Sequence, residues 1–293
     1  MSERAGAGRL APAKVNLYLH VGPPGADGYH PVCSLMAFAD VGDWLTARPS
    51  EALGLSVEGP FAAALAGEGD NLVLRAVRAL LAQAGAAQRP LHLTLDKQLP
   101  VAAGLGGGSS DAGAALRLVR DQLNLPVEDG ALEAVAASLG ADGAACLWGR
   151  AVTAEGRGQR LGPAPALPEL HAVLVNPGVP VSTPEVYRRF DAGGRFGEVA
   201  PPAGPAAFED APALADWLSR LRNDLEGPAV AVAPEVGNVL ATLRSAPQAL
   251  LARVSGSGGT CFALCAGPAE AQALARRIAA AARGWWVRPC RLA

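Results

Sequence analysis

A glycine-rich segment between a strand pattern and a helix pattern places the strongest limit on how this chain can fold. The segment runs from Pro100 to Asp111 and reads Pro-Val-Ala-Ala-Gly-Leu-Gly-Gly-Gly-Ser-Ser-Asp. Alternating leucines precede it (Leu91, Leu93 and Leu95), which is typical of a strand, and apolar residues with helical spacing follow it. Its glycines let an anion approach the backbone N–H groups closely. The segment therefore predicts a phosphate-binding loop that leads into the N-terminus of a helix.

Two serines, Ser109 and Ser110, follow the glycines where that helix is expected to begin. Their hydroxyls can cap the helix, or reach a phosphate oxygen or a bound Mg²⁺. A flexible turn that ends in a serine cap is the alternative interpretation. The P-loop does not match, because no lysine precedes the final serine. The dinucleotide fingerprint does not match either, because a second helix, rather than a strand, is expected next.

Length and charge narrow the class of protein. The chain has 293 residues, half of them hydrophobic, which suits two domains with sizeable cores. Its 25 basic and 27 acidic residues give a net charge of −2, so neither a nucleic acid nor a membrane surface is expected as a partner. No apolar run approaches the roughly 20 residues that span a bilayer. Residues 1–9 lack the apolar core of a signal peptide. The oligomeric state stays open.

Cysteine usage indicates a reducing, cytoplasmic location. The five cysteines are odd in number and scattered, which is typical of free thiols rather than of a disulfide framework. Neither a Cys-x-x-Cys pair nor a His-Glu-x-x-His helix is present, and the four histidines lie far apart. No metal site built from protein ligands is therefore expected.

The rest of the chain reads as alternating strands and helices without an internal repeat. Strands are expected over 14–21, 33–39, 91–95, 170–175, 253–254 and 261–265. Helices are expected over 71–83, 112–123, 131–139, 216–225, 236–243 and 270–281. The stretch 191–213 is rich in Pro, Ala and Gly and is expected to be an exposed excursion. Gly and Pro also cluster over 158–168, which predicts one domain over 1–160 and a second over 161–293.

Three segments, in order along the chain, resemble the three motifs of the GHMP kinases, which phosphorylate galactose, homoserine, mevalonate and related metabolites. They are Pro-Ala-Lys-Val-Asn at 12–16, the glycine loop at 100–111, and Val-Ser-Gly-Ser-Gly-Gly-Thr-Cys-Phe at 254–262. The resemblance implies a two-domain α+β GHMP kinase fold, with an N-terminal domain like domain 2 of ribosomal protein S5 and a ferredoxin-like C-terminal domain. It also implies an active site in the cleft between them and an ATP-dependent reaction with Mg²⁺.

The resemblance assigns ATP to the loop and to the start of one helix. Asp70 and Asn71 begin that helix where the family contacts adenine, although Asp70 can also act as a simple helix cap. The residues expected to contact ATP are Pro100, Val101, Ala102, Ala103, Gly104, Leu105, Gly106, Gly107, Gly108, Ser109, Ser110 and Asn71.

Further matches narrow the acceptor. Asp-Gly-Tyr-His at 27–30 and Asn-Asp-Leu at 223–225 resemble a family branch that phosphorylates the 2-hydroxyl of a cytidine-diphosphate-linked methylerythritol, on the non-mevalonate route to isoprenoid precursors. An aromatic ring can stack on cytosine, and an imidazole can bond to its edge. An ordinary turn with a core tyrosine is the alternative. The residues expected to contact the acceptor are Asn16, Tyr29, His30, Thr183, Tyr187, Gly258 and Gly259.

The same resemblance assigns the chemistry to Lys14 and Asp142. Asp142 accepts the hydroxyl proton or orients the hydroxyl, while Lys14 keeps Asp142 ionised and stabilises charge on the transferred group. One departure weakens the match: the family usually follows this aspartate with Val-Pro, whereas here Gly143-Ala-Ala-Cys146 follows. The missing proline frees the backbone just after the catalytic position.

Two other functions stay open. The chain can be another small-molecule kinase of this family, of the homoserine or mevalonate type, although the segments at 27–30 and 223–225 argue against that. It can also be an inactive binder of a nucleotide or metabolite, although retention of Lys14 and Asp142 argues against that. A dehydrogenase is disfavoured by the helix that follows the loop's own helix.

Overall fold

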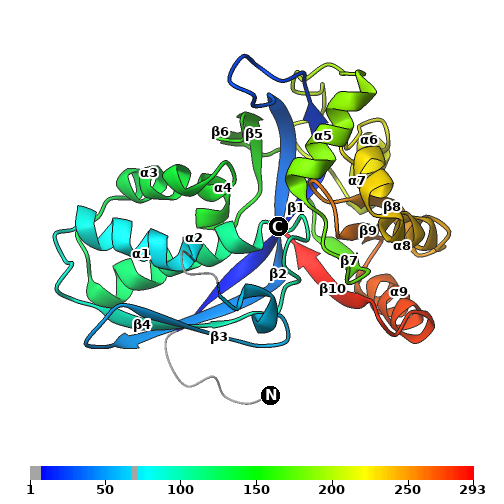
Figure 1. The fold of residues 1–293 in the computed structure, drawn as a ribbon. Helices are drawn as coiled ribbons and strands as arrows, with labels where there is room; N and C mark the ends of the chain where they lie inside the picture. The colour runs from blue at the N-terminus through cyan, green and yellow to red at the C-terminus, as the bar shows by residue number, and fades with distance from the viewer. Residues whose placement is uncertain (1–7, 68–70) are drawn as a thin grey trace. The chain divides into compact units, whose positions relative to one another are not determined.

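A computed structural model describes residues 8–67 and 71–293, and its elements are labelled in Figure 1. The chain forms two compact units. The described part of the first unit comprises residues 8–13, 42–67, 71–101 and 106–149. The second comprises residues 14–41, 102–105 and 150–293. Each unit takes several segments, whereas the domains expected from sequence make one cut at 160; that cut stays a prediction.

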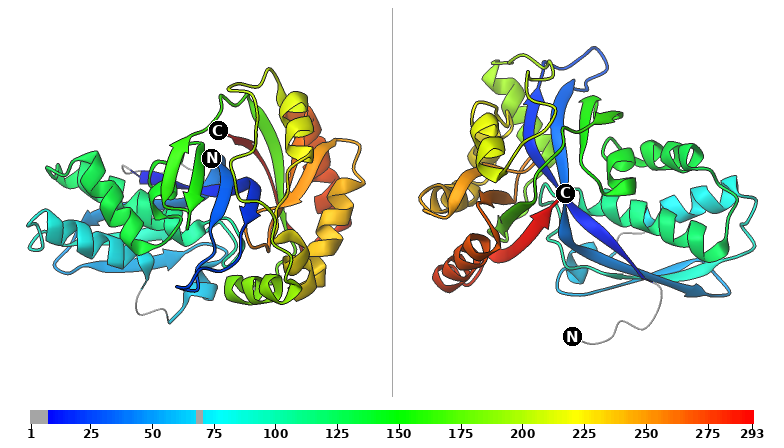
Figure 2. Two further views of the ribbon diagram at one scale, coloured as in Figure 1. Left: turned by 90° about the horizontal axis from the view of Figure 1, so that it is seen from above. Right: turned by 180° about the vertical axis from the view of Figure 1, so that it is seen from behind.

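The first unit packs helices on one face of a small sheet, as Figures 1 and 2 show. Residues 44–49 of β2 pair antiparallel with β4, and β4 pairs parallel with β3. β1 also pairs with β2. Alternate leucines of β4 face the helices and are fully buried, which matches the period of two read from the sequence. The bounds are β1 (Gly8–Val21), β2 (Val32–Pro49), β3 (Gly54–Glu58), a 3-10 turn (Ala62–Leu65), α1 (Leu72–Gln83), β4 (Leu91–Asp96), α2 (Gly107–Leu123), α3 (Asp129–Leu139) and α4 (Gly143–Trp148).

The second unit is built on antiparallel strands in the order β10-β7-β9-β8. Residues 32–36 of β2 pair with β5, and β5 pairs with β6. Leu292 of β10 lies opposite Ala39 of β2. α8 and α9 lie on the same side of the strands (Figure 2) and share one apolar core with β7, β8 and β9. The bounds are β5 (Val152–Gly156), β6 (Arg160–Pro163), β7 (Leu170–Asn176), α5 (Thr183–Gly193), α6 (Ala211–Ser219), α7 (Glu226–Val232), α8 (Pro234–Arg244), β8 (Ala249–Val254), β9 (Cys261–Cys265), α9 (Pro268–Ala281) and β10 (Trp286–Leu292).

Most elements expected from sequence are confirmed, although β1 begins six residues earlier and β2 ends ten residues later than expected. The helix expected over 216–225 is confirmed only over 216–219 and is wrong over 220–225. α6 ends at Ser219, and α7 begins only at Glu226. Between them the backbone bonds to β1 instead: Arg222 O accepts from Leu19 N at 3.0 Å, and Asp224 N donates to Leu19 O at 2.9 Å. These long-range bonds replace the local helical bonds that the sequence pattern favours.

The segment expected to be an exposed excursion, 191–213, begins inside α5 and ends inside α6, and many of its residues between the helices are exposed. Four strands, β3, β5, β6 and β10, and three helices, α4, α5 and α7, were not predicted from the sequence. Within residues 8–67 and 71–293, no helix has both the length and the apolar character needed to cross a membrane.

Candidate active site

The first half of the glycine loop, residues 102–105, is held by the third glycine motif. Thr260 N donates to Ala103 O at 3.0 Å, and the Ser255 hydroxyl donates to Gly104 O at 3.0 Å. A Cβ on Gly104 would lie 2.5 Å from Gly258 O and would also collide with Ser255 O. Its φ of +73° is a second reason for glycine. Gly104 is therefore needed so that two backbone segments can touch, in addition to any role toward a phosphate.

The first motif joins the same cluster. Lys14 N donates to Leu105 O at 2.8 Å, and Asn16 N donates to the Ser255 hydroxyl at 3.2 Å. The Asn16 amide nitrogen bonds to Ser34 at 2.8 Å, which leaves Asn16 Oδ1 buried without a hydrogen-bond partner. Parts of all three family-like motifs thus meet within the second unit, around the Ser255 hydroxyl.

The second half of the loop opens α2 in the first unit. Gly106 is the N-cap residue in a left-handed conformation (φ +63°), and α2 begins at Gly107. The helix therefore starts five residues earlier than the apolar stripe predicts, so that the last glycines and both serines form its first turn. The first N–H groups of a helix have no acceptor within the helix and favour an anion. Ser110 Oγ is buried there without a hydrogen-bond partner.

Beneath this first turn lies a buried cluster of three ionisable groups that sequence reasoning missed. Lys97 Nζ donates to Asp43 Oδ2 at 2.5 Å and to Asp111 Oδ2 at 2.7 Å. Asp43 Oδ1 also accepts from Gln98 N (2.6 Å) and from Leu99 N. A Cβ on Gly107 would lie 3.1 Å from Lys97 Nζ. The cluster ties the chain that leaves β4 to the first turn of α2.

The two carboxylates compete for one cation. Burial, reinforced by repulsion from Asp43, raises the pKa of Asp111 to about 8 against the opposing effect of Lys97. Burial alone would lower the pKa of Lys97, but the neighbouring carboxylates raise it above its ordinary value. The only sequence signals were Asp96-Lys97 at a strand end and the aspartate that closes the glycine motif.

The predicted acceptor residues fall into two groups. His30 and Tyr187 lie together, with ring centroids 4.9 Å apart, and the His30 ring approaches Asp191 at 3.4 Å. Tyr29 is 59 % exposed, and Arg157 lies over its ring, with the guanidinium carbon 4.3 Å from the centroid. The structure thus brings His30 and Tyr187 together, while the ring of Tyr29, the residue before His30, stays largely exposed.

Of three other predicted acceptor residues, Gly258 and Gly259 belong to the third motif and Thr183 lies beside it. The Thr183 hydroxyl lies 2.7 Å from that of Ser257. Gly258 and Gly259 have φ of +103° and +86°, and a Cβ on Gly259 would lie 2.9 Å from Ala103 Cα. Thr183 therefore lies beside the same turn that holds the glycine loop.

The residues expected at adenine are explained in part by helix capping. The Asn71 side chain accepts from Val73 N at 2.9 Å and caps α1. This is the capping geometry that stabilises helix starts. Asp70 lies outside the described residues. Contact of Asn71 with ATP stays a prediction.

The two predicted catalytic residues lie in different units. Lys14 is on β1 of the second unit and is 5 % exposed. Asp142 is half-buried and immediately precedes α4 of the first unit, where its side chain does not cap the helix. Their catalytic roles stay predictions.

The unusual sequence after Asp142 has a packing reason. Gly143 is buried, and a Cβ there would collide with Ala136 O and lie 2.7 Å from Ala136 C. α4 therefore packs against α3 at a distance that only glycine permits. This contact explains the glycine at 143, and Asp142 immediately precedes α4.

Comparisons with known proteins agree with this architecture. Residues 71–150 match the model of the GHMP kinases N terminal domain, and residues 206–284 match that of the GHMP kinases C terminal domain. A protein of Caulobacter vibrioides (strain NA1000 / CB15N), named 4-diphosphocytidyl-2-C-methyl-D-erythritol kinase, is 56% identical over 97% of this chain and 98% of its own. A protein of the same name from Hyphomonas neptunium is 51% identical over 96% and 95%.

Solved structures extend the comparison to the fold. A crystal structure of 4-(cytidine 5'-diphospho)-2C-methyl-D-erythritol kinase superposes with a TM-score of 0.78 at 36% identity, over 97% of this chain and 98% of that one. Homoserine kinase from Cytophaga hutchinsonii superposes with a TM-score of 0.68 at 18% identity, over 99% and 96%, which speaks for the fold alone. The two-domain α+β fold predicted from sequence is confirmed, and the chain belongs to the GHMP kinase family.

Proposed function

We propose that this chain transfers the γ-phosphoryl group of ATP to the 2-hydroxyl of 4-diphosphocytidyl-2-C-methyl-D-erythritol, on the non-mevalonate route to isopentenyl diphosphate. The observation that carries the proposal is the junction at Ser255. Its hydroxyl accepts from Asn16 N of the first motif and donates to Gly104 O of the glycine loop. Relatives that carry this enzyme's name match over nearly their full length, which supports the choice of substrate.

The nucleotide is expected at the first turn of α2. The glycines leave backbone N–H groups open to an anion. The Ser110 hydroxyl, which has no hydrogen-bond partner, is suited to donate to a phosphate oxygen or to bind Mg²⁺. Mg²⁺ bound with ATP would neutralise charge on the transferred phosphoryl group. We place the ATP contacts on residues 100–110 and on Asn71.

In this proposal Lys14 and Asp142 carry the chemistry. Asp142 orients the acceptor hydroxyl or takes its proton, and Lys14 stabilises the charge that develops on the transferred group. Asn16 Oδ1, a buried acceptor with unfilled bonding capacity, fits contact with an acceptor hydroxyl. Phosphoryl transfer has a loose transition state, so positioning contributes as much as proton transfer.

The cytidine is expected between the aromatic residues. Tyr29 has an exposed ring for stacking. His30 Nδ1 already lies 2.8 Å from Gly22 O, so the base edge is assigned to Nε2, which lies 3.4 Å from Asp191. Thr183, Gly258 and Gly259 lie at the third motif and are assigned to the acceptor's other end. All five cysteines are free and buried, which fits the reducing cytoplasm.

A panel of acceptors tests the proposal. Purified protein with ATP and Mg²⁺ is offered 4-diphosphocytidyl-2-C-methyl-D-erythritol, homoserine, mevalonate or galactose, and ADP release is followed. We expect turnover with the first compound alone. Preferential turnover of another acceptor would move the chain to a different kinase of the family. Nucleotide binding without turnover of any acceptor would favour an inactive binder.

A further inference from the structure

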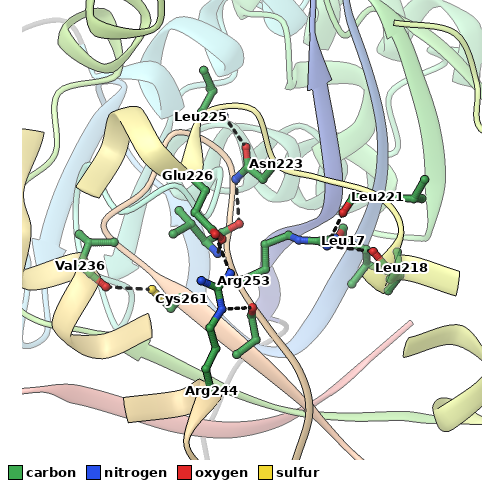
Figure 3. Close-up of polar contacts among 12 residues, drawn as sticks. Leu17, Leu218, Leu221, Asn223, Leu225, Glu226, Val236, Arg244, Arg253 and Cys261 are labelled. Carbon is green, nitrogen blue, oxygen red and sulfur yellow. Dashed lines mark hydrogen bonds and ion pairs between the residues drawn. The ribbon is translucent and has the colours of Figure 1, made fainter. Parts of the chain in front are cut away.

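Residues 220–225, between α6 and α7, hydrogen-bond to the backbone where the third glycine motif begins (Figure 3). The Asn223 side-chain amide donates to Val254 O at 2.9 Å and to Gly256 O at 2.8 Å. Its Oδ1 accepts from Leu225 N at 3.0 Å. Asn223 is only 7 % exposed, so water cannot replace these bonds. One amide group therefore holds the carbonyls on both sides of Ser255.

Glu226 holds the same backbone from the open edge of the sheet. β8 is the last strand in the order, and such an edge leaves backbone groups without a neighbouring strand. Glu226 Oε2 accepts from Val254 N at 3.1 Å, while Oε1 accepts from Arg244 at 2.6 Å. The carboxylate thus takes the place of a strand at the last residue of β8.

Arg253 fixes the other end of this stretch. Its buried guanidinium donates to the backbone oxygens of Leu17 (2.7 Å), Leu218 (2.9 Å) and Leu221 (2.7 Å), as the dashed lines in Figure 3 show. Burial lowers the pKa of Arg253 to about 10, which leaves it charged at neutral pH. Together with the bonds between Leu19 and residues 222–224, these contacts fasten residues 218–226 between β1 and β8.

The carbonyls held by Asn223 flank the residue that joins the three motifs. Ser255 can accept from Asn16 N and donate to Gly104 O only while its backbone keeps this conformation. A displacement of Val254 or Gly256 would therefore move the Ser255 hydroxyl relative to both of its partners. Sites of this kind need supporting residues that fix the groups in contact with substrate.

We propose that Asn223 and Glu226 are positioning residues for phosphoryl transfer, which set the Ser255 turn and, through it, Asn16 and the first half of the glycine loop. Neither residue needs to touch a substrate. The inference rests on the proposed function, because the effect on turnover presupposes a kinase.

Asn223→Asp is the sharpest test, because it changes one donor group into a carboxylate oxygen that faces two carbonyl oxygens. Asn238→Asp makes the same chemical change on an exposed face of α8 and serves as the matched control. At a temperature well below either variant's Tm, we expect kcat/KM of Asn223→Asp to fall at least tenfold and that of Asn238→Asp to stay within twofold. A folded Asn223→Asp protein with kcat/KM equal to the control would overturn the proposal.

Glu226 supplies a test that does not depend on Asn223→Asp folding. Glu226→Gln keeps an oxygen acceptor for Val254 N, whereas Glu226→Ala removes it. We expect Glu226→Gln to recover most of the kcat/KM that Glu226→Ala loses. Equal losses of kcat/KM in both variants would mean that turnover depends on the ion pair with Arg244 rather than on the bond to Val254. That result would contradict the proposal.

A measurement without turnover separates this inference from the proposed function. Thr260 N donates to Ala103 O, so hydrogen exchange of the Thr260 amide reports how the turn is docked on the loop. We expect faster exchange at Thr260 in Asn223→Asp than in Asn238→Asp. If wild-type protein phosphorylated none of the acceptors but this difference persisted, the proposed function would fail while the coupling stood. An unchanged exchange rate at the Thr260 amide would contradict the coupling between Asn223 and the glycine loop.

Discussion

The two halves of the glycine loop are held in contrasting ways. Residues 102–105 are held by backbone hydrogen bonds and one serine hydroxyl, with Gly104 in contact with the third motif. Residues 106–111 begin α2 above the buried cluster of Lys97, Asp43 and Asp111. Close backbone contact at Gly104 shapes the first half, and a buried cluster of ionisable groups supports the second. The contrast teaches that a lysine close to a phosphate loop can serve its architecture instead of its chemistry.

The first prediction is that Lys14, whose backbone N–H bonds to Leu105 in the first half of the loop, matters for turnover together with Asp142. Asp142→Asn keeps size but removes the charge, so kcat should fall by roughly 10²–10⁴-fold, the usual contribution of a general base. Lys14→Ala should lower kcat similarly, and the double variant should lose less than the product of the two. Steady-state kinetics measures all three. Near-normal kcat in Asp142→Asn would remove that residue from the chemistry.

The second prediction concerns stability and Lys97. Lys97→Met removes the cation that bonds to both buried acidic side chains, Asp43 and Asp111, so the free energy of unfolding should fall by about 3–5 kcal/mol. Arg220→Met breaks an exposed ion pair with Asp216 and should cost at most about 1 kcal/mol. Urea unfolding of both variants checks the difference. A loss for Lys97→Met as small as that of the control would erase the contrast between the two halves.

A third, smaller effect is the dependence of stability on pH. The folded-state pKa of Asp111, about 8, lies above its ordinary value of 3.8, so the folded state holds a proton that the unfolded state releases between these pH values. This group therefore makes the free energy of unfolding fall as pH rises through that window. Asp111→Asn should flatten the fall. The check is urea unfolding at several pH values, and an equal slope in wild type and variant would argue against a protonated Asp111.

The smallest predicted effect separates stability from nucleotide binding. A Cβ on Gly108 would meet no protein atom within 4 Å, whereas one on Gly107 would approach Lys97. Gly108→Ala should therefore raise the free energy of unfolding by about 0.5 kcal/mol, because alanine favours a helix. It should also weaken nucleotide binding, because the methyl group takes space offered to a phosphate. Calorimetric titration measures the affinity, and unchanged affinity would mean that the phosphates lie elsewhere.

The parts of the molecule that sequence could predict are those with local causes. Alternation of Leu91, Leu93 and Leu95 predicts β4, and the glycines predict a loop at a helix start; both are confirmed. The cluster of Lys97 with Asp43 was missed because Asp43 lies 54 residues away along the chain. The end of the helix expected over 216–225 is wrong for the same reason, since beyond Ser219 bonds to Leu19 on β1 outweigh the local pattern. Long-range pairing leaves no periodic signature in a single sequence.

The contact of Gly143 with Ala136 has an evolutionary consequence. Because a side chain at position 143 has no room while α3 keeps its distance, a relative with valine there needs a different course of the chain around position 136. Because the obstacle is backbone, glycine at 143 is expected to accompany the close spacing of α3 and α4 rather than a particular residue at 136. A lineage that acquired glycine first could draw the helices together without displacing its aspartate. Reversion to Val-Pro would then be blocked by a neighbour that had already moved.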